Sequence, residues 1–164
     1  MANRALYEED IGAIQTVLKG LLDTCYAQGA LLVDNAGQLI LNAGTTPDFD
    51  LHAFASLVAA DFAANSELAR LLGEDSFSTL VHQGGRENLY LTRVNPRVIL
   101  AAVYDKRTSL GLVRLRVKRC VSELRECFQR LFDRRQQSIA DVPMFDPALV
   151  HGLESELERA FGQQ

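Results

Sequence analysis

The sequence predicts an α+β domain in which amphipathic helices and short apolar strands follow one another along a single chain. Apolar residues recur every three to four positions over 7–25, which is typical of a helix. A turn-rich tetrad at 34–37 separates two short apolar runs, and 98–103 is apolar throughout, as expected for a strand buried on both faces. The predicted order is helix, strand, strand, helix, three strands, helix and a terminal helix. A chain of 164 residues fits one domain with a short appendage.

The first helix is predicted over 7–25, with the acidic residues at 8–10 in its first turn, where the helix dipole favours negative charge. The tetrad Asp-Asn-Ala-Gly at 34–37 then predicts a β-hairpin between 31–33 and 39–41. Its glycine can adopt the positive φ that such a turn requires.

A second helix is predicted over 51–72, with Asp50 as its N-cap and Gly73 after its last turn. One side carries mostly large apolar residues and is expected to face the core: Phe54, Leu57, Val58, Ala64, Leu68, Leu71 and Leu72. The opposite side carries small and polar residues: Ser56, Ala59, Ala60, Ala63, Glu67 and Arg70. Small side chains at this spacing let another backbone approach closely, which favours a contact surface. The alternative is that the alanines only raise helix propensity.

Three strand-like runs follow over 77–81, 88–92 and 98–104, separated by glycine and proline turns. The segment from Leu110 alternates apolar and basic residues as a strand would. However, its three- and four-residue apolar spacing continues for about six turns, so length favours a helix capped at 108–109.

The main domain is predicted to span 1–135, followed by a polar linker over 136–145 and an amphipathic helix within 146–164. Asp146 and Pro147 suit the N-cap and first position of that helix. Its apolar residues recur at four-residue steps: Leu149, Leu153, Leu157 and Phe161. A helix this short needs a surface to pack on. It either folds back on its own sheet or contacts a partner.

Composition restricts the function classes. The net charge of −4 argues against generic nucleic-acid binding, although residues 106–135 hold ten Lys or Arg against three Asp or Glu. That basic segment is either an electrostatic docking face or a solvated helix face. No stretch reaches the roughly 18 apolar residues of a membrane helix, and no export signal is evident, so no membrane insertion and a cytoplasmic location are expected.

No metal, cofactor or catalytic centre is predicted. Cys25, Cys120 and Cys127 have no metal or redox spacing and are expected to be buried thiols, and the histidines have no metal spacing either. The candidate acid–base residues fit no reaction at their spacing: Asp34, Asp61, His82 and Tyr104. A protein that acts by contacting another protein is therefore favoured over an enzyme, with small-molecule sensing on a similar scaffold as an alternative.

Four segments resemble the Roadblock family, named for a dynein light chain, and within it the bacterial MglB group. They are 31–40, 57–73, 77–84 and 105–114, inside a resemblance over about 7–132, and the last is the most specific to the MglB group. The resemblance implies a five-stranded antiparallel sheet with two helices on one face and one on the other. The C-terminal helical extension goes beyond a minimal Roadblock domain.

The resemblance also implies a homodimer, because Roadblock chains pair the second helix and third strand across a two-fold axis. The dimer contacts are then expected at Phe77, Thr79, Val81 and His82. MglB-like members are GTPase-activating partners of MglA, a small Ras-like GTPase that controls bacterial cell polarity and gliding motility, and this role is compatible with a location at a cell pole. Carried onto this chain, the GTPase contacts are expected at Ser56, Ala59, Ala60, Ala63, Glu67 and Arg70.

The implied mechanism repositions the partner's switch region rather than inserting an arginine into its active site. An inserted Arg70 is the alternative, and a scaffold that binds a GTPase without stimulating it is the rival function. The terminal helix is expected to supply a second partner contact through Leu149, Leu153, Leu157 and Phe161.

Overall fold

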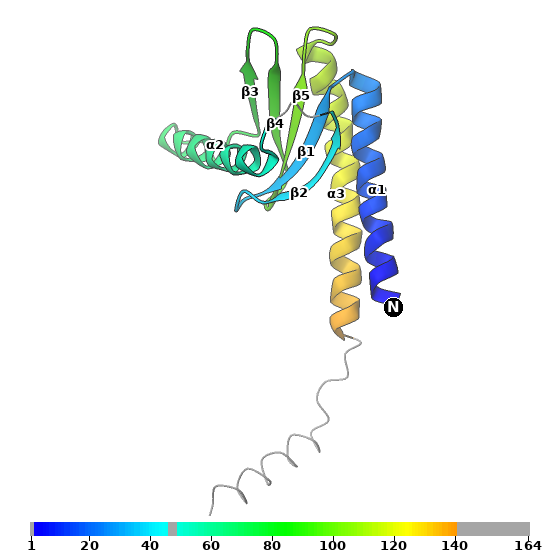
Figure 1. Ribbon diagram of the computed structural model, residues 1–164. Helices are drawn as coiled ribbons and strands as arrows, with labels where there is room; N and C mark the ends of the chain where they lie inside the picture. Colours follow the sequence, from blue (N-terminus) through cyan, green and yellow to red (C-terminus); the bar gives the residue numbers. More distant parts are fainter. Residues whose placement is uncertain (1, 46–48, 141–164) are drawn as a thin grey trace, which may run out of the picture. The chain divides into compact units, whose positions relative to one another are not determined.

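Five antiparallel strands form one sheet with helices on both faces (Figure 1). The structure, a computed structural model, describes residues 2–45 and 49–140. Met1–Gln129 form one compact unit, which holds the sheet and the site considered below. The elements in chain order are α1 (Ala2–Cys25), β1 (Gly29–Asp34), β2 (Leu39–Gly44), α2 (Leu51–Leu71), β3 (Thr79–Gln83), β4 (Asn88–Asn95), β5 (Val98–Tyr104) and α3 (Leu110–Ala140).

The strand order is β2-β1-β5-β4-β3, so β2 and β3 form the two edges. Every residue of β5 is buried, which confirms the prediction of a central strand at Val98–Tyr104. The predicted hairpin is also confirmed, since β1 and β2 pair antiparallel. In contrast, β3 begins at Thr79, two residues later than predicted, so Phe77 precedes the strand.

Helix α2 covers one face of the sheet, while α1 and the part of α3 up to Gln129 lie on the other face (Figure 1). On the α2 face, the helix contributes Ala55, Val58, Ala59 and Phe62 to a cluster with inward-facing strand residues. Those strand residues are Leu31, Val33, Leu91, Ile99, Ala101 and Val103. They alternate along their strands, as expected when successive side chains point to opposite faces.

Helix α1 begins at Ala2, five residues earlier than predicted. The acidic residues at 8–10 therefore lie beyond its first turn, and the prediction that they interact with the helix N-terminus was wrong. The early start reflects Ala2, Arg4 and Leu6, since alanine, arginine and leucine all favour helices.

The segment from Leu110, which could have been a strand or a helix by its sequence pattern, is a helix, as predicted from its length. The Ser109 hydroxyl accepts a hydrogen bond from the Leu112 amide at 3.2 Å and so caps the helix. The helix continues to Ala140, so the prediction of a linker over 136–145 was wrong for residues 136–140, and the rest of that range lies outside the described residues. Glutamine is a good helix former, and the polar residues at 136–138 extend the helix instead of ending it.

The predicted terminal helix within 146–164, with Leu149, Leu153, Leu157 and Phe161, lies outside the described residues. Within the residues that the structure describes, no helix is long and apolar enough to cross a membrane. Cys25, Cys120 and Cys127 are buried, as predicted. Burial raises the pKa of the Cys120 thiol to about 12, so this thiol stays protonated and unreactive at neutral pH.

Candidate interaction surface on the second helix

Local contacts fix both ends of α2. The Asp50 carboxylate accepts hydrogen bonds from the His52 and Ala53 amides at 2.9 and 3.2 Å, which confirms it as the N-cap. After the last turn Gly73 has φ +79°, a conformation that glycine adopts without strain. Near its N-terminal end α2 touches the β1–β2 turn. A side chain at Gly37 would place its Cβ 2.8 Å from the Ser56 Cα, so this approach requires glycine.

The face of α2 that packs on the sheet differs from the predicted one. The buried residues are Ala55, Val58, Ala59, Phe62 and Ala69. Four leucines expected in the core are instead exposed by 68, 53, 80 and 73%: Leu57, Leu68, Leu71 and Leu72. The prediction assumed that the bulkiest residues face the core, whereas here alanines face the sheet and let the helix pack closely on it.

One exposed flank of α2 forms an aliphatic stripe, which we define as Leu57, Asp61, Ala64, Leu68 and Leu71. These positions alternate four- and three-residue steps, so they lie along one side of the helix. This flank faces the edge strand β3, because the Asp61 carboxylate contacts the imidazole of His82, with 2.6 Å between Oδ2 and Nε2. Exposed leucines along one flank, rather than scattered singly, indicate a contact surface.

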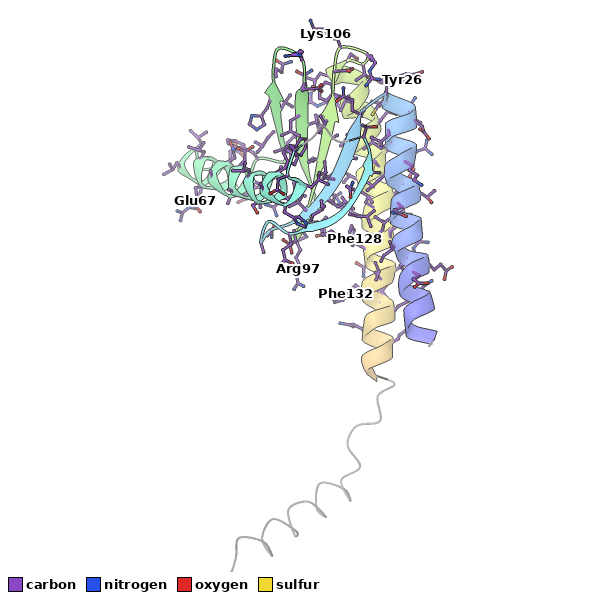
Figure 2. All side chains as sticks on the ribbon, viewed as in Figure 1. Tyr26, Glu67, Arg97, Lys106, Phe128 and Phe132 are labelled. Carbon is purple, nitrogen blue, oxygen red and sulfur yellow. The ribbon has the colours of Figure 1, made fainter. Side chains whose placement is uncertain are left out.

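The second exposed flank, the small-residue flank, consists of Ser56, Ala60, Ala63, Glu67 and Arg70. Arg70 Nη2 and Glu67 Oε2 are 2.5 Å apart, and both side chains are largely exposed. The Glu67 side chain projects from α2 away from the sheet (Figure 2). Ala59 differs: it is only 8% exposed and lies in the core cluster, so its predicted place on the exposed side was wrong.

The outer side of β3 is open, because β4 is its one strand partner within the described chain. Leu80 packs against the α2 core cluster, so His82, two residues later, shares the α2 face. By the same alternation Thr79 and Val81 point to the opposite face, and Val81 is exposed. Of the predicted dimer residues on β3, Thr79 and Val81 therefore point to one face of the strand, and His82 points to the other, where it contacts Asp61 of α2.

The four candidate acid–base residues do not converge. Asp61 and His82 are in contact, but Asp34 lies in the β1–β2 turn, where its carboxylate accepts from the Ala36 and Gln38 amides. Tyr104 is buried and, because the neighbouring Val103 lies in the α2 core cluster, it points to the opposite face of the sheet from α2. Among the described residues, no group of three or more His, Cys, Asp or Glu could hold a metal ion. The surface offers shape and apolar area rather than reactive groups.

Comparison with known proteins identifies the fold. The Roadblock/LC7 domain family matches residues 13–104. Myxococcus xanthus MglB is 44% identical, with 71% of this chain and 95% of that chain covered and a TM-score of 0.69. The gliding protein MglB of Thermus thermophilus is 33% identical, with coverage of 74 and 92% and a TM-score of 0.69.

A further structure, an MglB with a tetrameric arrangement, is 34% identical, with coverage of 76 and 90% and a TM-score of 0.67. No curated protein sequence matches the chain significantly. Three findings point to the same family: the order of helices and strands, the family match over residues 13–104, and the sequence identity to MglB. The chain therefore belongs to the Roadblock/LC7 family and has an MglB-like fold.

Proposed function

We propose that this protein is a homodimeric activator of a small Ras-like GTPase of the MglA type, with a role in bacterial cell polarity and motility. The observation that carries the proposal is the division of α2 into two exposed flanks, on a chain 44% identical to Myxococcus xanthus MglB. One flank suits a second copy of the chain, and the other suits a different partner.

The dimer would form through β3 and the aliphatic stripe. An unpaired strand edge presents a row of backbone N–H and C=O groups that another strand can pair with. Two copies joined along β3 would make a continuous ten-stranded sheet and bring their α2 stripes together. Burying Leu57, Leu68 and Leu71 would stabilise the dimer by roughly 1.5–3 kcal/mol for each side chain. The relative with a tetrameric arrangement supports self-association in this group of proteins.

The small-residue flank would receive the GTPase. Ala60 and Ala63 allow a partner's backbone to approach α2 closely, and the Glu67–Arg70 pair gives the contact a polar rim. This flank carries no acid–base group other than that pair. Activation would therefore come from holding the partner's own switch region and catalytic residues in place, which lowers a barrier by positioning.

An inserted arginine is the competing mechanism, and Arg70 is its candidate. An exposed ion pair such as Arg70–Glu67 contributes little stability, so it would not prevent Arg70 from reaching a partner. Arginine fingers contribute about 10³–10⁵ in rate. The effect of removing Arg70 on GTP turnover therefore separates the two mechanisms.

The decisive experiment measures GTP hydrolysis by an MglA-type GTPase with increasing amounts of this protein. We expect hydrolysis to accelerate and to saturate as the complex forms. Binding without acceleration would instead identify a scaffold and refute the activator function.

Removing residues 143–164 and comparing hydrolysis with nucleotide release would reveal whether the terminal segment adds a second contact.

A further inference from the structure

The aliphatic stripe contains one ionisable residue, Asp61. Leu57 lies one turn before it, and Ala64 and Leu68 follow on the same side of the helix. The Asp61 side chain is 30% exposed, and its Oδ2 lies 2.6 Å from Nε2 of His82 on β3. Because a carboxylate can only accept, the His82 nitrogen carries the proton and donates it.

Asn65 supplies the second donor. Its Nδ2 lies 2.8 Å from Asp61 Oδ1 and 2.8 Å from the Asp61 carbonyl oxygen. Both carboxylate oxygens of Asp61 therefore have a donor within the same chain, one from the next turn of α2 and one from the edge strand. A charge covered by apolar groups is strongly disfavoured unless such donors are already in place. The stripe can thus be covered without leaving this carboxylate unpaired.

We propose that the Asp61–His82 pair is the specificity-determining contact of the self-association surface, an inference that rests on the dimer proposed above. When a second copy covers the stripe, the pair loses water but keeps its hydrogen bonds. Two identical stripes carry two such carboxylates, which repel one another if the helices meet in a register that brings them together. The pair selects the offset in which each carboxylate faces apolar residues of the second copy, as one polar residue does in a coiled-coil seam.

This role differs from support of the monomer fold. The His82 side chain is 54% exposed in the monomer, and a hydrogen bond that is in contact with water contributes little to the free energy of unfolding. Covering by a second copy removes the water that weakens the interaction. The effect of the pair should therefore appear in the dimer dissociation constant rather than in the folding of the single chain.

The test is a set of variants compared by sedimentation equilibrium. His82→Ala should weaken the dimer by about 100-fold, because it leaves a covered carboxylate with one donor fewer. Asp61→Ala should weaken the dimer by about tenfold or less, because it removes the carboxylate, so that no covered charge is left without a hydrogen-bond donor. The double variant should behave like Asp61→Ala, and Asp61→Leu should equal or exceed the wild-type affinity.

His52→Ala is the matched control, since His52 is an exposed histidine at the start of the same helix, and it should leave the dimer unchanged. Circular dichroism checks that each variant folds. Equal weakening by His82→Ala and Asp61→Ala, or weaker association of Asp61→Leu, overturns this inference while the dimer itself stands. A wild-type chain that remains monomeric at micromolar concentration overturns both the inference and the proposed function.

Discussion

The two edges of the sheet are built differently. At the β2 edge the register with β1 shifts after Leu32, which pairs with Leu41, while Val33 pairs with Leu39, so Ile40 is an extra residue. Such a bulge twists an edge and disfavours pairing with another chain. Helix α1 also packs against this strand (Figure 1). At the β3 edge the register with β4 is regular over all five residues of the strand.

The side chains around the two edges also make β3 the more suitable edge for contact with another chain. The exposed leucines of α2 form a stripe on the side of the helix that faces β3. At the β2 edge, Ile40 is the one large apolar side chain of the strand that is exposed. One edge is protected against further pairing, and the other is left open beside an apolar surface. The difference indicates which side of the monomer is available to a second copy.

The largest effect should follow from Leu68→Glu, which places an unpaired charge in the stripe. Covering that charge should weaken the dimer by about 4 kcal/mol, or about 1,000-fold. Sedimentation equilibrium measures the change. Leu115→Glu is the control, because Leu115 is 61% exposed on α3, and it should leave the dimer intact. If Leu68→Glu remained a dimer, the stripe would not be part of the interface.

Ala63→Arg tests the small-residue flank. A large charged side chain in place of a small one should prevent close approach and weaken GTPase binding by at least about 100-fold, while the dimer stays intact. Titration calorimetry with the GTP-bound partner measures the affinity. Ser122→Arg, at an exposed position on α3, should have no effect. Unchanged binding of the Ala63→Arg variant would remove the assignment of this flank.

Val81→Lys and Ile40→Lys compare the two edges directly. The parent side chains are similarly exposed, at 38 and 41%, so they form a matched pair. Lysine on an edge strand disfavours pairing with another strand. At β3 it should therefore weaken the dimer by about 2 kcal/mol, or about 30-fold, and at β2 it should change nothing. Equal responses measured by sedimentation would mean that the dimer uses neither edge selectively.

The smallest effect is expected from Arg70→Ala. If the partner's own residues perform hydrolysis, stimulated GTP turnover should fall by less than about threefold, because the variant loses only an exposed ion pair. Single-turnover hydrolysis with saturating amounts of the protein measures this. A loss of about 10³ with binding retained would identify Arg70 as an arginine finger.

Most of the fold could be predicted because local signals agree with it. Asp50 and Gly73 mark the ends of α2, and the apolar run at 98–103 marks the central strand. The buried face of α2 could not be assigned in the same way, because its alanines become core residues only through the short distance between helix and sheet. The sequence did contain a signal for a second apolar flank, because apolar residues recur from Leu57 onward at alternating steps of four and three residues.

The Asp61–His82 contact joins residues 21 positions apart on a helix and an edge strand. No spacing rule predicts such a contact, since it depends on how α2 lies across the sheet. The end of α3 was misplaced for a different reason. Polar residues at 136–138 were interpreted as a linker, although glutamine is compatible with both linkers and helices.

The composition of the complex with an MglA-type GTPase shows whether one flank of α2 serves self-association while the other receives the partner. Light scattering coupled to size-exclusion chromatography gives the mass of the complex in the GTP-bound state. We expect a complex that contains two copies of this chain. A complex of one copy with one GTPase, or no complex, would contradict this expectation.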